Sequence, residues 1–423
     1  MKLIKVIILL FFSLLATYAS DEDLASFDKV WSTVNEKHWD LAATGVDWQK
    51  VYETYKPRVL AAKNRSECRQ LLSQMLAELG QSHFQIMESK SGTKVEDLRR
   101  LYGGNATPGF KVALVENRVF IVQIAEGSDA SRLNMGIGTE ILKIDNKPLE
   151  PIVKEILEAY EGEPNSAVHI PDTLNSVFAG GLSQRITLLL QEGDVTRQVT
   201  IPLTAPEGEY KNLMSLNGLF FVYESKVLPG NVGYVHFNIF LPDAGQRFKE
   251  DMDTIFKDTN GLIIDVRGNP GGMGIMAVTI VNRMFSEKGL RLGSMVNSGG
   301  KMNFPIFPQK PLYDKPVAIL VDQSSASTSE ILAGGMQDLG RARIFGVTTA
   351  GAALPSVITD LPNGDRFQYA IANYVTYNGR HLESIGMVPD QLTPHTLASM
   401  ARKQDASLSA ACEWIKKSPN GVK

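Results

Sequence analysis

The sequence has few cysteines and few histidines. Its 423 residues contain two cysteines, Cys68 and Cys412. Two cysteines permit one disulfide and exclude both a disulfide framework and a cysteine-rich metal site, and the sequence leaves open whether they pair. The six histidines do not combine with carboxylates at metal-ligand spacing, and no His-Glu-x-x-His motif is present. We therefore expect no metal and no other cofactor.

Charge of one sign is also missing. The formal net charge is -3, and the 43 basic and 46 acidic residues are interspersed without a long run of either sign. This distribution lacks the basic patch of a nucleic-acid-binding protein, so we expect no nucleic-acid partner. With 43% hydrophobic residues the chain can bury a real core, and its length predicts two or three domains.

One apolar run stands near the start of the chain. Lys2 and Lys5 precede the apolar residues 6–15, and small residues up to Ala19 follow. This pattern is typical of a signal peptide over residues 1–19, cleaved after Ala19. The alternative is an uncleaved anchor, but the run is short for about 30 Å of hydrocarbon. We expect a periplasmic or secreted protein with no stable membrane span after cleavage.

The rest of the chain predicts an α+β multidomain protein. Residues 20–105 show helical spacing of apolar residues, whereas residues 106–205 contain short β-rich runs separated by turns. In residues 206–400, strand-like runs such as 261–266 and 316–321 alternate with helical runs at 274–285 and 329–339. This alternation indicates an α/β core with parallel pairing. A C-terminal helical tail is expected over residues 401–423.

The sharpest local feature is a strand that runs directly into a helix. The apolar segment Pro316 to Val321 is followed by small residues that include Ser327, and a helical pattern begins at once. A serine at such a corner exposes its Oγ, and the free N–H groups of the helix start can stabilise an oxyanion. The alternative is an ordinary serine N-cap.

A second apolar strand, Leu262 to Val266, ends in the turn Arg-Gly-Asn-Pro-Gly-Gly. Its glycines allow a substrate carbonyl to approach the main chain, so Gly271 is a candidate oxyanion donor together with the amide of Thr328. No Gly-Lys-Ser or Gly-Lys-Thr follows, which excludes a phosphate loop.

A serine nucleophile needs a base within hydrogen-bonding distance. His83 follows a helical run that ends at Gly80, so its side chain is free to enter a cleft. The alternative is a surface histidine.

Five motifs occur in an order that resembles the C-terminal processing peptidases. They are residues 232–235 (Val-Gly-Tyr-Val), 262–272, the segment 325–330 with Asp338, 346–351 (Gly-Val-Thr-Thr-Ala-Gly) and 386–390 (Gly-Met-Val-Pro-Asp). The resemblance covers nearly the whole mature chain. It implies a peptidase core similar to ClpP and crotonase, a peptide or protein substrate, and Ser327 as the nucleophile, because the family serine lies three residues before a glutamate.

The chain departs from this family at one position. Tail-specific members pair the serine with a lysine, and Ala352 stands where that lysine is expected. The tricorn-core branch, which the chain also resembles, uses a Ser-His pair and a late glutamate instead. Ser82, His83 and Glu383 match that pattern, so the resemblance implies a tetrad of these three residues with Ser327.

Two alternatives to this tetrad stay open. In the first, Ala352 replaces a catalytic lysine and the chain is an inactivated Ser-Lys peptidase. In the second, the chain is a catalytically silent relative that binds peptides or other ligands in the same cleft.

Residues 106–205 resemble the PDZ domain of the family. Pro108-Gly109-Phe110 is similar to its carboxylate-binding loop, which implies that Gly109 and Phe110 bind substrate. A PDZ domain adds an extended peptide to a sheet edge. The alternative is a β module that only packs on the core. The sequence leaves a homo-oligomer open.

Overall fold

The computed structural model describes residues 20–88, 106–161, 166–213 and 216–418. The chain forms two compact units, one of residues 1–89 with 356–371 and one of residues 90–355 with 372–423. The predicted signal peptide lies outside the described residues.

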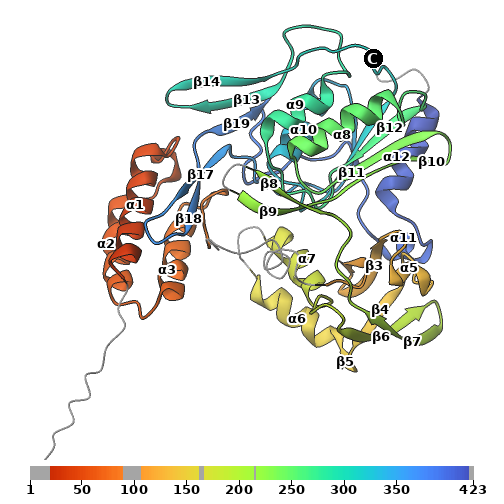
Figure 1. Cartoon of the computed structure of the whole chain (residues 1–423), viewed down its shortest axis with the longest axis horizontal. Helices are drawn as coiled ribbons and strands as arrows, with labels where there is room; N and C mark the ends of the chain where they lie inside the picture. The colour runs from red at the N-terminus through yellow and green to blue at the C-terminus, as the bar shows by residue number, and fades with distance from the viewer. Residues whose placement is uncertain (1–19, 89–105, 162–165, 214–215, 419–423) are drawn as a thin grey trace, which may run out of the picture. The chain divides into compact units, whose positions relative to one another are not determined.

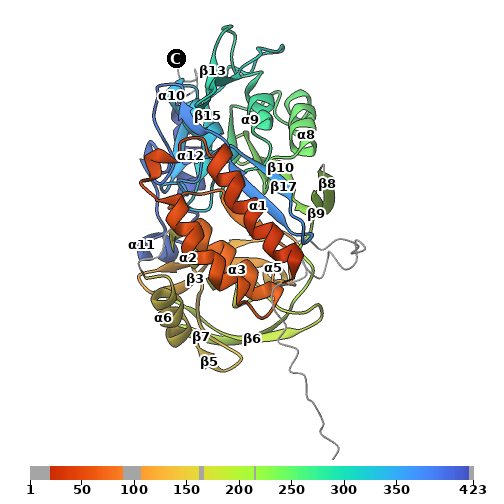
Figure 2. The ribbon, with the colours of Figure 1, turned by 90° about the vertical axis from the view of Figure 1, so that its left-hand side faces the viewer.

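The first unit is built on helices α1 (Asp21–Lys37), α2 (Trp48–Leu60) and α3 (Arg65–Ala77), with a 3-10 turn at Ala42–Thr44 (Figure 2). Each of these α-helices begins after a side chain that accepts a backbone N–H of the first turn, namely Ser20, Asp47 and Asn64. Apolar residues at helical spacing face one shared core. The helical prediction for this region is confirmed.

A hairpin from far along the chain completes this unit. Strands β17 (Ser356–Asp360) and β18 (Arg366–Ala370) form a three-stranded sheet with β1 (Gln85–Met87), in the order β1-β18-β17. Phe367 and Tyr369 of β18 are buried in the core of the helices. Arg69 of α3 donates two hydrogen bonds, of 2.7 and 2.8 Å, to the buried carboxylate of Asp365. The hairpin is therefore a structural part of the helical unit.

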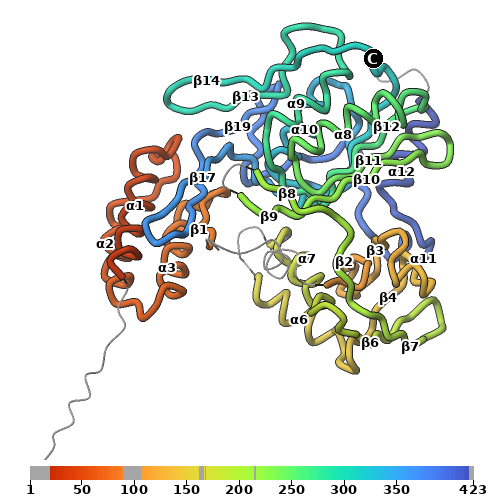
Figure 3. Tube along the Cα trace, viewed as in Figure 1, coloured from red at the N-terminus to blue at the C-terminus, as the bar shows by residue number. Residues whose placement is uncertain are grey.

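The second unit begins with a β domain. Its sheet has the order β2-β3-β4-β6-β7, with the short β5 paired to β4 (Figure 3). Its elements are β2 (Phe110–Val115), β3 (Arg118–Ile124), α5 (Asp129–Arg132), β4 (Glu140–Ile144), β5 (Lys147–Pro148), α6 (Leu149–Ala159), α7 (Ser166–Ser176), β6 (Arg185–Glu192) and β7 (Val195–Pro202). Strand β2 is an edge strand. The β-rich prediction for this region is confirmed.

The main sheet of the second unit has the order β10-β11-β12-β15-β16-β20 (Figure 1). Strands β10 (Tyr223–Leu228) and β11 (Val232–Phe237) are antiparallel, whereas β11, β12 (Gly261–Asp265), β15 (Val317–Val321), β16 (Arg343–Gly346) and β20 (Gln391–Leu392) are parallel. Alternate residues of the central strands enter two separate cores. The predicted α/β core is confirmed.

Helices cover both faces of this sheet. Helices α8 (Pro242–Asp253), α9 (Gly274–Val281) and α10 (Thr328–Asp338) share the larger core, and α12 (Ala406–Lys417) lies on the other face through Ala411 and Ile415. Helix α9 stops four residues before the predicted end at 285, because the backbone turns there and the carbonyl of Asn282 accepts the N–H of Gln309 at 2.8 Å.

The remaining elements of the second unit form smaller groups. Strands β13 (Arg291–Asn297), β14 (Gly300–Pro305) and β19 (Asn373–Thr376) make a sheet in the order β14-β13-β19, and β8 (Glu209–Leu213) pairs with β9 (Leu216–Phe221). The short helix α11 (Leu397–Ala401) precedes α12. Across the described ranges, no helix combines the length and apolar character needed to cross a membrane.

Both cysteines are free thiols. Cys68 lies on α3 and Cys412 on α12. Burial raises the pKa of the Cys68 thiol to about 11, which keeps it protonated and unreactive at neutral pH.

Candidate active site

The candidate nucleophile Ser327 lies at the corner between β15 and α10. Its backbone angles are φ 53° and ψ -113°, a conformation that residues with a side chain rarely adopt. Such a strained residue persists only where the surrounding structure holds it, and strain of this kind clusters at functional sites. The structure thus confirms the sharp strand-to-helix corner and places Ser327 at its most strained point.

Glu330 holds this corner from inside the core. Its side chain is fully buried, and its carboxylate accepts four hydrogen bonds. The donors are the N–H of Ser327 (3.0 Å), the N–H of Ala352 (3.0 Å), the N–H of Gly351 (2.9 Å) and the hydroxyl of Thr349 (2.6 Å). Four donors fill the lone pairs of an ionised carboxylate. Burial nevertheless raises the pKa of Glu330 to about 7, against these hydrogen bonds.

Thr349 extends this arrangement to a third segment. Its hydroxyl donates to Glu330 and accepts the backbone N–H of Met387 at 2.6 Å. One buried carboxylate therefore connects the serine corner, the loop 349–353 and the loop 383–387. Sequence reasoning did not single out Glu330 or Thr349 for this role, although Glu330 is the residue that marks the family serine.

Ala352 lies in direct contact with the serine corner. Its carbonyl accepts the N–H of Ser327 at 2.8 Å. The sequence departure from the Ser-Lys pattern thus falls beside the nucleophile, and an alanine side chain supplies no proton acceptor there.

Glu383 is attached to the same loop. One of its carboxylate oxygens accepts the N–H of Ala353 at 3.1 Å, and the N–H of the next residue, Ser384, donates to the carbonyl of Gly351 at 2.7 Å. Ser384 has a φ of 60°, so this turn is also strained. Two of the four predicted tetrad residues, Ser327 and Glu383, are thus fixed by one short loop of the second unit.

The glycine turn after β12 reaches the serine closely. A side-chain carbon placed on Gly271, whose φ is 109°, would lie 2.7 Å from Cβ of Ser327, so only glycine fits. The N–H of Gly271 donates to Oδ1 of the buried Asn269 at 2.9 Å. The neighbouring Gly272 is exposed, and among the described residues no acceptor is found for its N–H or for that of Thr328.

Gly271 and Thr328, the predicted oxyanion donors, thus lie beside Ser327. Their role as donors stays a prediction. Gly272 was missed, although the second glycine of the Gly-Gly pair was a visible signal. The two turns are held together by Asp322, whose Oδ1 accepts the N–H groups of Gly268 at 2.9 Å and Ser324 at 3.0 Å.

The candidate base lies in the first unit. His83 has a φ of 62°, and its Nδ1 is 2.7 Å from the hydroxyl of Ser82. Burial lowers the pKa of His83 to about 4, so the imidazole is neutral, the form of a general base, at neutral pH. His83 precedes β1, in which Gln85 pairs with Gln368 of the hairpin. Extending this antiparallel register places His83 level with Ala370 and its partner Ser356.

Gly109 and Phe110 lie at the start of β2. Gly109 has a φ of 77°, and a side-chain carbon there would lie 2.4 Å from Cβ of Ser128, so the loop requires glycine. The ring of Phe110 is buried and meets Phe178 edge-on, with ring centroids 5.7 Å apart. The predicted role of both residues in substrate binding stays a prediction.

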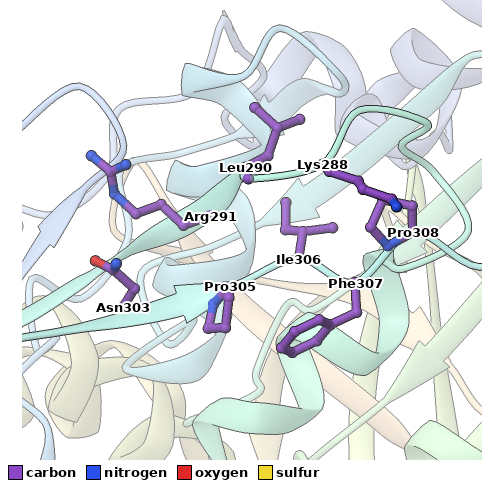
Figure 4. Close-up of a pocket in the computed structure, with 9 residues that line it drawn as sticks. Lys288, Leu290, Arg291, Asn303, Pro305, Ile306, Phe307 and Pro308 are labelled. Atoms are coloured by element: carbon purple, nitrogen blue, oxygen red, sulfur yellow. The ribbon is translucent and has the colours of Figure 1, made fainter.

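An open pocket lies elsewhere in the second unit, near β13 and β14 (Figure 4). Its lining includes Leu290, Ile306, Phe307, Lys288 and Arg291, and none of the predicted site residues. Within the ranges that the structure describes, no group of three or more His, Cys, Asp or Glu side chains is placed to hold a metal ion.

Comparison with known families matches three parts of the chain. Residues 231–393 match peptidase family S41, residues 20–77 match the tricorn protease C1 domain, and residues 105–210 match a PDZ domain. The three matches fall in separate parts of the chain, and the predicted domain bounds stay a prediction.

Curated relatives match over most of the chain. A carboxyl-terminal-processing protease of Picosynechococcus sp. is 24% identical over 98% of this chain and 94% of the relative. A carboxyl-terminal-processing protease of Synechocystis sp. is 26% identical over 88% of this chain and 81% of the relative.

Solved structures share the fold. The photosystem II D1 C-terminal processing protease matches with a TM-score of 0.53 and 22% identity, covering 92% of this chain and 99% of its own. The tricorn protease matches with a TM-score of 0.51 and 15% identity, covering 94% of this chain and 37% of its own. At these identities the likeness establishes the fold alone.

Proposed function

We propose catalytic roles for four residues of this chain, which belongs to the serine peptidases of family S41 of the C-terminal processing type and carries a PDZ domain. Ser327 is the nucleophile and His83 its general base. Ser82 and Glu383 orient the imidazole. The substrate is a peptide or protein, and the reaction is hydrolysis of a peptide bond through an acyl-enzyme.

In the first step, Oγ of Ser327 attacks the scissile carbonyl carbon while Nε2 of His83 takes the Oγ proton. The carbonyl oxygen becomes an oxyanion, which the N–H groups of the glycine turn and of Thr328 stabilise. The C–N bond then breaks as His83 returns the proton to the leaving amine. Water repeats the sequence on the acyl-enzyme and releases the carboxylic acid product.

The observation that carries this proposal is the conformation of Ser327. Its strained backbone is held by the buried carboxylate of Glu330, and it lies directly beside the glycine turn and at the start of α10. An ordinary N-cap serine lies in the extended region of backbone angles, whereas Ser327 has a positive φ.

Two observations support His83 as the base. Its neutral imidazole contacts Ser82, and a hydrogen bond from Nδ1–H to that hydroxyl would leave Nε2 unprotonated for proton transfer. The second observation is the connection along the chain. In the extended register His83 is level with Ala370, which pairs with Ser356, the first residue of β17. Ser356 follows Ala353 by three residues. Ala353 is the residue whose N–H donates to Glu383.

A fluorophosphonate probe, which phosphonylates an activated serine, tests the nucleophile. We expect the wild-type chain to be labelled and Ser327→Ala to lose all labelling. Ser324→Ala, in the same turn, is the matched control and should label normally. An unlabelled wild-type chain, or a labelled Ser327→Ala variant, would contradict the assignment.

We also propose that the protein is exported, with residues 1–19 removed as a signal peptide. Amino-terminal sequencing of the protein recovered from the periplasm or medium should begin at Ser20. Recovery of a chain that begins at Met1 would contradict this part of the proposal.

A further inference from the structure

The free edge of β2 is where a PDZ domain adds a peptide. An edge strand presents unpaired N–H and C=O groups, and an extended peptide binds by pairing with them. In this protein β2 follows directly on the Pro108–Phe110 loop, and its other edge pairs with β3. A peptide in this domain would therefore contact the outward-facing backbone groups of β2.

Two of those groups, the N–H and the C=O of Val112, are already bonded within the chain. The side chain of Asn175, on α7, accepts the N–H of Val112 at 2.9 Å and donates to the carbonyl of the same residue at 3.0 Å. An amide side chain that bonds both groups of one residue reproduces the pair of hydrogen bonds that a neighbouring strand would make. A third bond, from Asn175 to the carbonyl of Pro171 at 2.8 Å, fixes its orientation.

Apolar side chains of α7 fill the space beside β2. Ile170 and Leu174, one helical turn apart, meet Leu114 of β2 on one side and Val153 and Ile156 of α6 on the other. Leu174 is buried, and all five belong to the core of the PDZ domain or pack against it. Residues of β2, α6 and α7 (Figure 3) therefore line one small apolar space, and α7 contributes two of its side chains.

The chain beyond α7 continues along the loop that precedes β2. Phe178 is buried against the ring of Phe110, and Gly180 exchanges backbone hydrogen bonds of 2.8 and 3.0 Å with Ala106. Contacts therefore run from Val112 back past Phe110 to Ala106. The same segment, 170–180, covers the β2 edge and the predicted substrate residue Phe110.

We propose that α7 is an internal ligand of this PDZ domain, and that an extended peptide pairs with β2 only when α7 has left the groove. An internal ligand competes at the high effective concentration of a short tether. If the open state holds about a tenth of the molecules, the apparent Kd for an external peptide rises about tenfold. This inference concerns binding alone and does not depend on the roles proposed for Ser327 and His83.

Asn175→Ala tests the proposal, because it removes both hydrogen bonds to Val112 while leaving β2 intact. Binding is measured on the full chain in a Ser327→Ala background, by fluorescence anisotropy of a labelled hexapeptide with an apolar last residue and a free carboxylate. We expect Asn175→Ala to bind this peptide about tenfold or more tightly than its parent. The same peptide with an amidated C-terminus should gain nothing.

Ser176→Ala is the matched control, since the Ser176 hydroxyl donates only to the carbonyl of Thr173 and not to β2. It should bind like the parent. Leu174→Asp is a second variant that expels α7 by placing a charge in the apolar space. Because Leu174→Asp keeps Asn175, hydrogen exchange at the Val112 amide, protected in the parent, reports in this variant whether α7 has left.

Two outcomes would overturn the proposal. One is a parent chain that binds the free-acid peptide as tightly as Asn175→Ala. The other is exposure of the Val112 amide in Leu174→Asp, which keeps Asn175, without any gain in peptide binding. Neither outcome bears on fluorophosphonate labelling, so failure here is distinguishable from failure of the catalytic assignment.

Discussion

The buried carboxylate of Glu330 accepts the backbone N–H of Ser327 at 3.0 Å. This contact joins the most strained residue of the site to the residue that also binds the loop 349–352. The serine corner is therefore held by a buried carboxyl group rather than by packing alone.

Glu330→Gln should lower the rate of fluorophosphonate labelling about a hundredfold or more. One oxygen of the carboxylate would become an NH2 group facing N–H donors, which leaves buried donors unpaired. Because burial raises the pKa of Glu330 to about 7, wild-type labelling should also fall as the pH drops through 7 and the carboxylate takes up a proton.

Glu140→Gln is the matched control for this change. Glu140 is a buried glutamate in the PDZ domain that pairs with Arg118. Its replacement should leave the labelling rate and its pH dependence unchanged. If Glu330→Gln were labelled at the wild-type rate, Glu330 would not be needed to hold the conformation of Ser327.

Thr349→Val should reduce labelling and destabilise the protein by about 1–3 kcal/mol, because the buried N–H of Met387 loses its acceptor. Thr349→Ser restores the hydroxyl and should recover the rate. Thr259→Val removes a hydroxyl of similar burial that bonds Tyr313 in the same core, so it should cost stability but not activity. Labelling and thermal unfolding measured side by side separate the two effects.

His83→Ala should lower turnover of a peptide substrate by about a thousandfold or more, as loss of a base does in serine peptidases generally. Since burial lowers the pKa of His83 to about 4, the wild-type acid limb due to this residue should lie near pH 4 rather than 6.5. The pH dependence of turnover is best measured in Glu330→Gln, because this change removes the loss of activity near pH 7. If turnover of that variant fell near pH 6.5, His83 would titrate as an exposed imidazole, against this prediction.

Ala352→Lys tests the alternative that a catalytic lysine has been replaced. We expect no rise in turnover above wild type, because the proposed base is His83, and no rescue when the change is combined with His83→Ala. A variant more than about tenfold faster than wild type would instead favour the Ser-Lys mechanism, with a tenfold change in rate corresponding to about 1.4 kcal/mol in the barrier.

The serine corner was predictable because its signal is local. An apolar strand, a run of small residues and a helix start follow one another within residues 316–338, and each is specified by its own sequence. The β-rich runs that form β2, β3 and β4 are local in the same way. Here the sequence pattern and the structure agree closely.

Features that depend on distant residues were not predictable. Nothing in residues 356–370 indicates which core receives Phe367 and Tyr369. That core is formed by helices nearly 300 residues earlier, as the separation of 296 between Arg69 and Asp365 shows. The bond between Asn269 and the N–H of Gly271, and that between Asn175 and Val112, likewise arise from side-chain geometry that no spacing rule contains.

The pairing of β1 with β18 also constrains the order of assembly. Gln85 meets Gln368 across 283 residues, so the helical unit lacks its second and third strands until almost the whole chain has left the ribosome. Contacts this far apart in sequence form slowly. The unit that holds His83 therefore cannot be completed before residue 370 has been synthesised, and a nascent chain stalled before residue 356 should stay sensitive to added protease over residues 20–88.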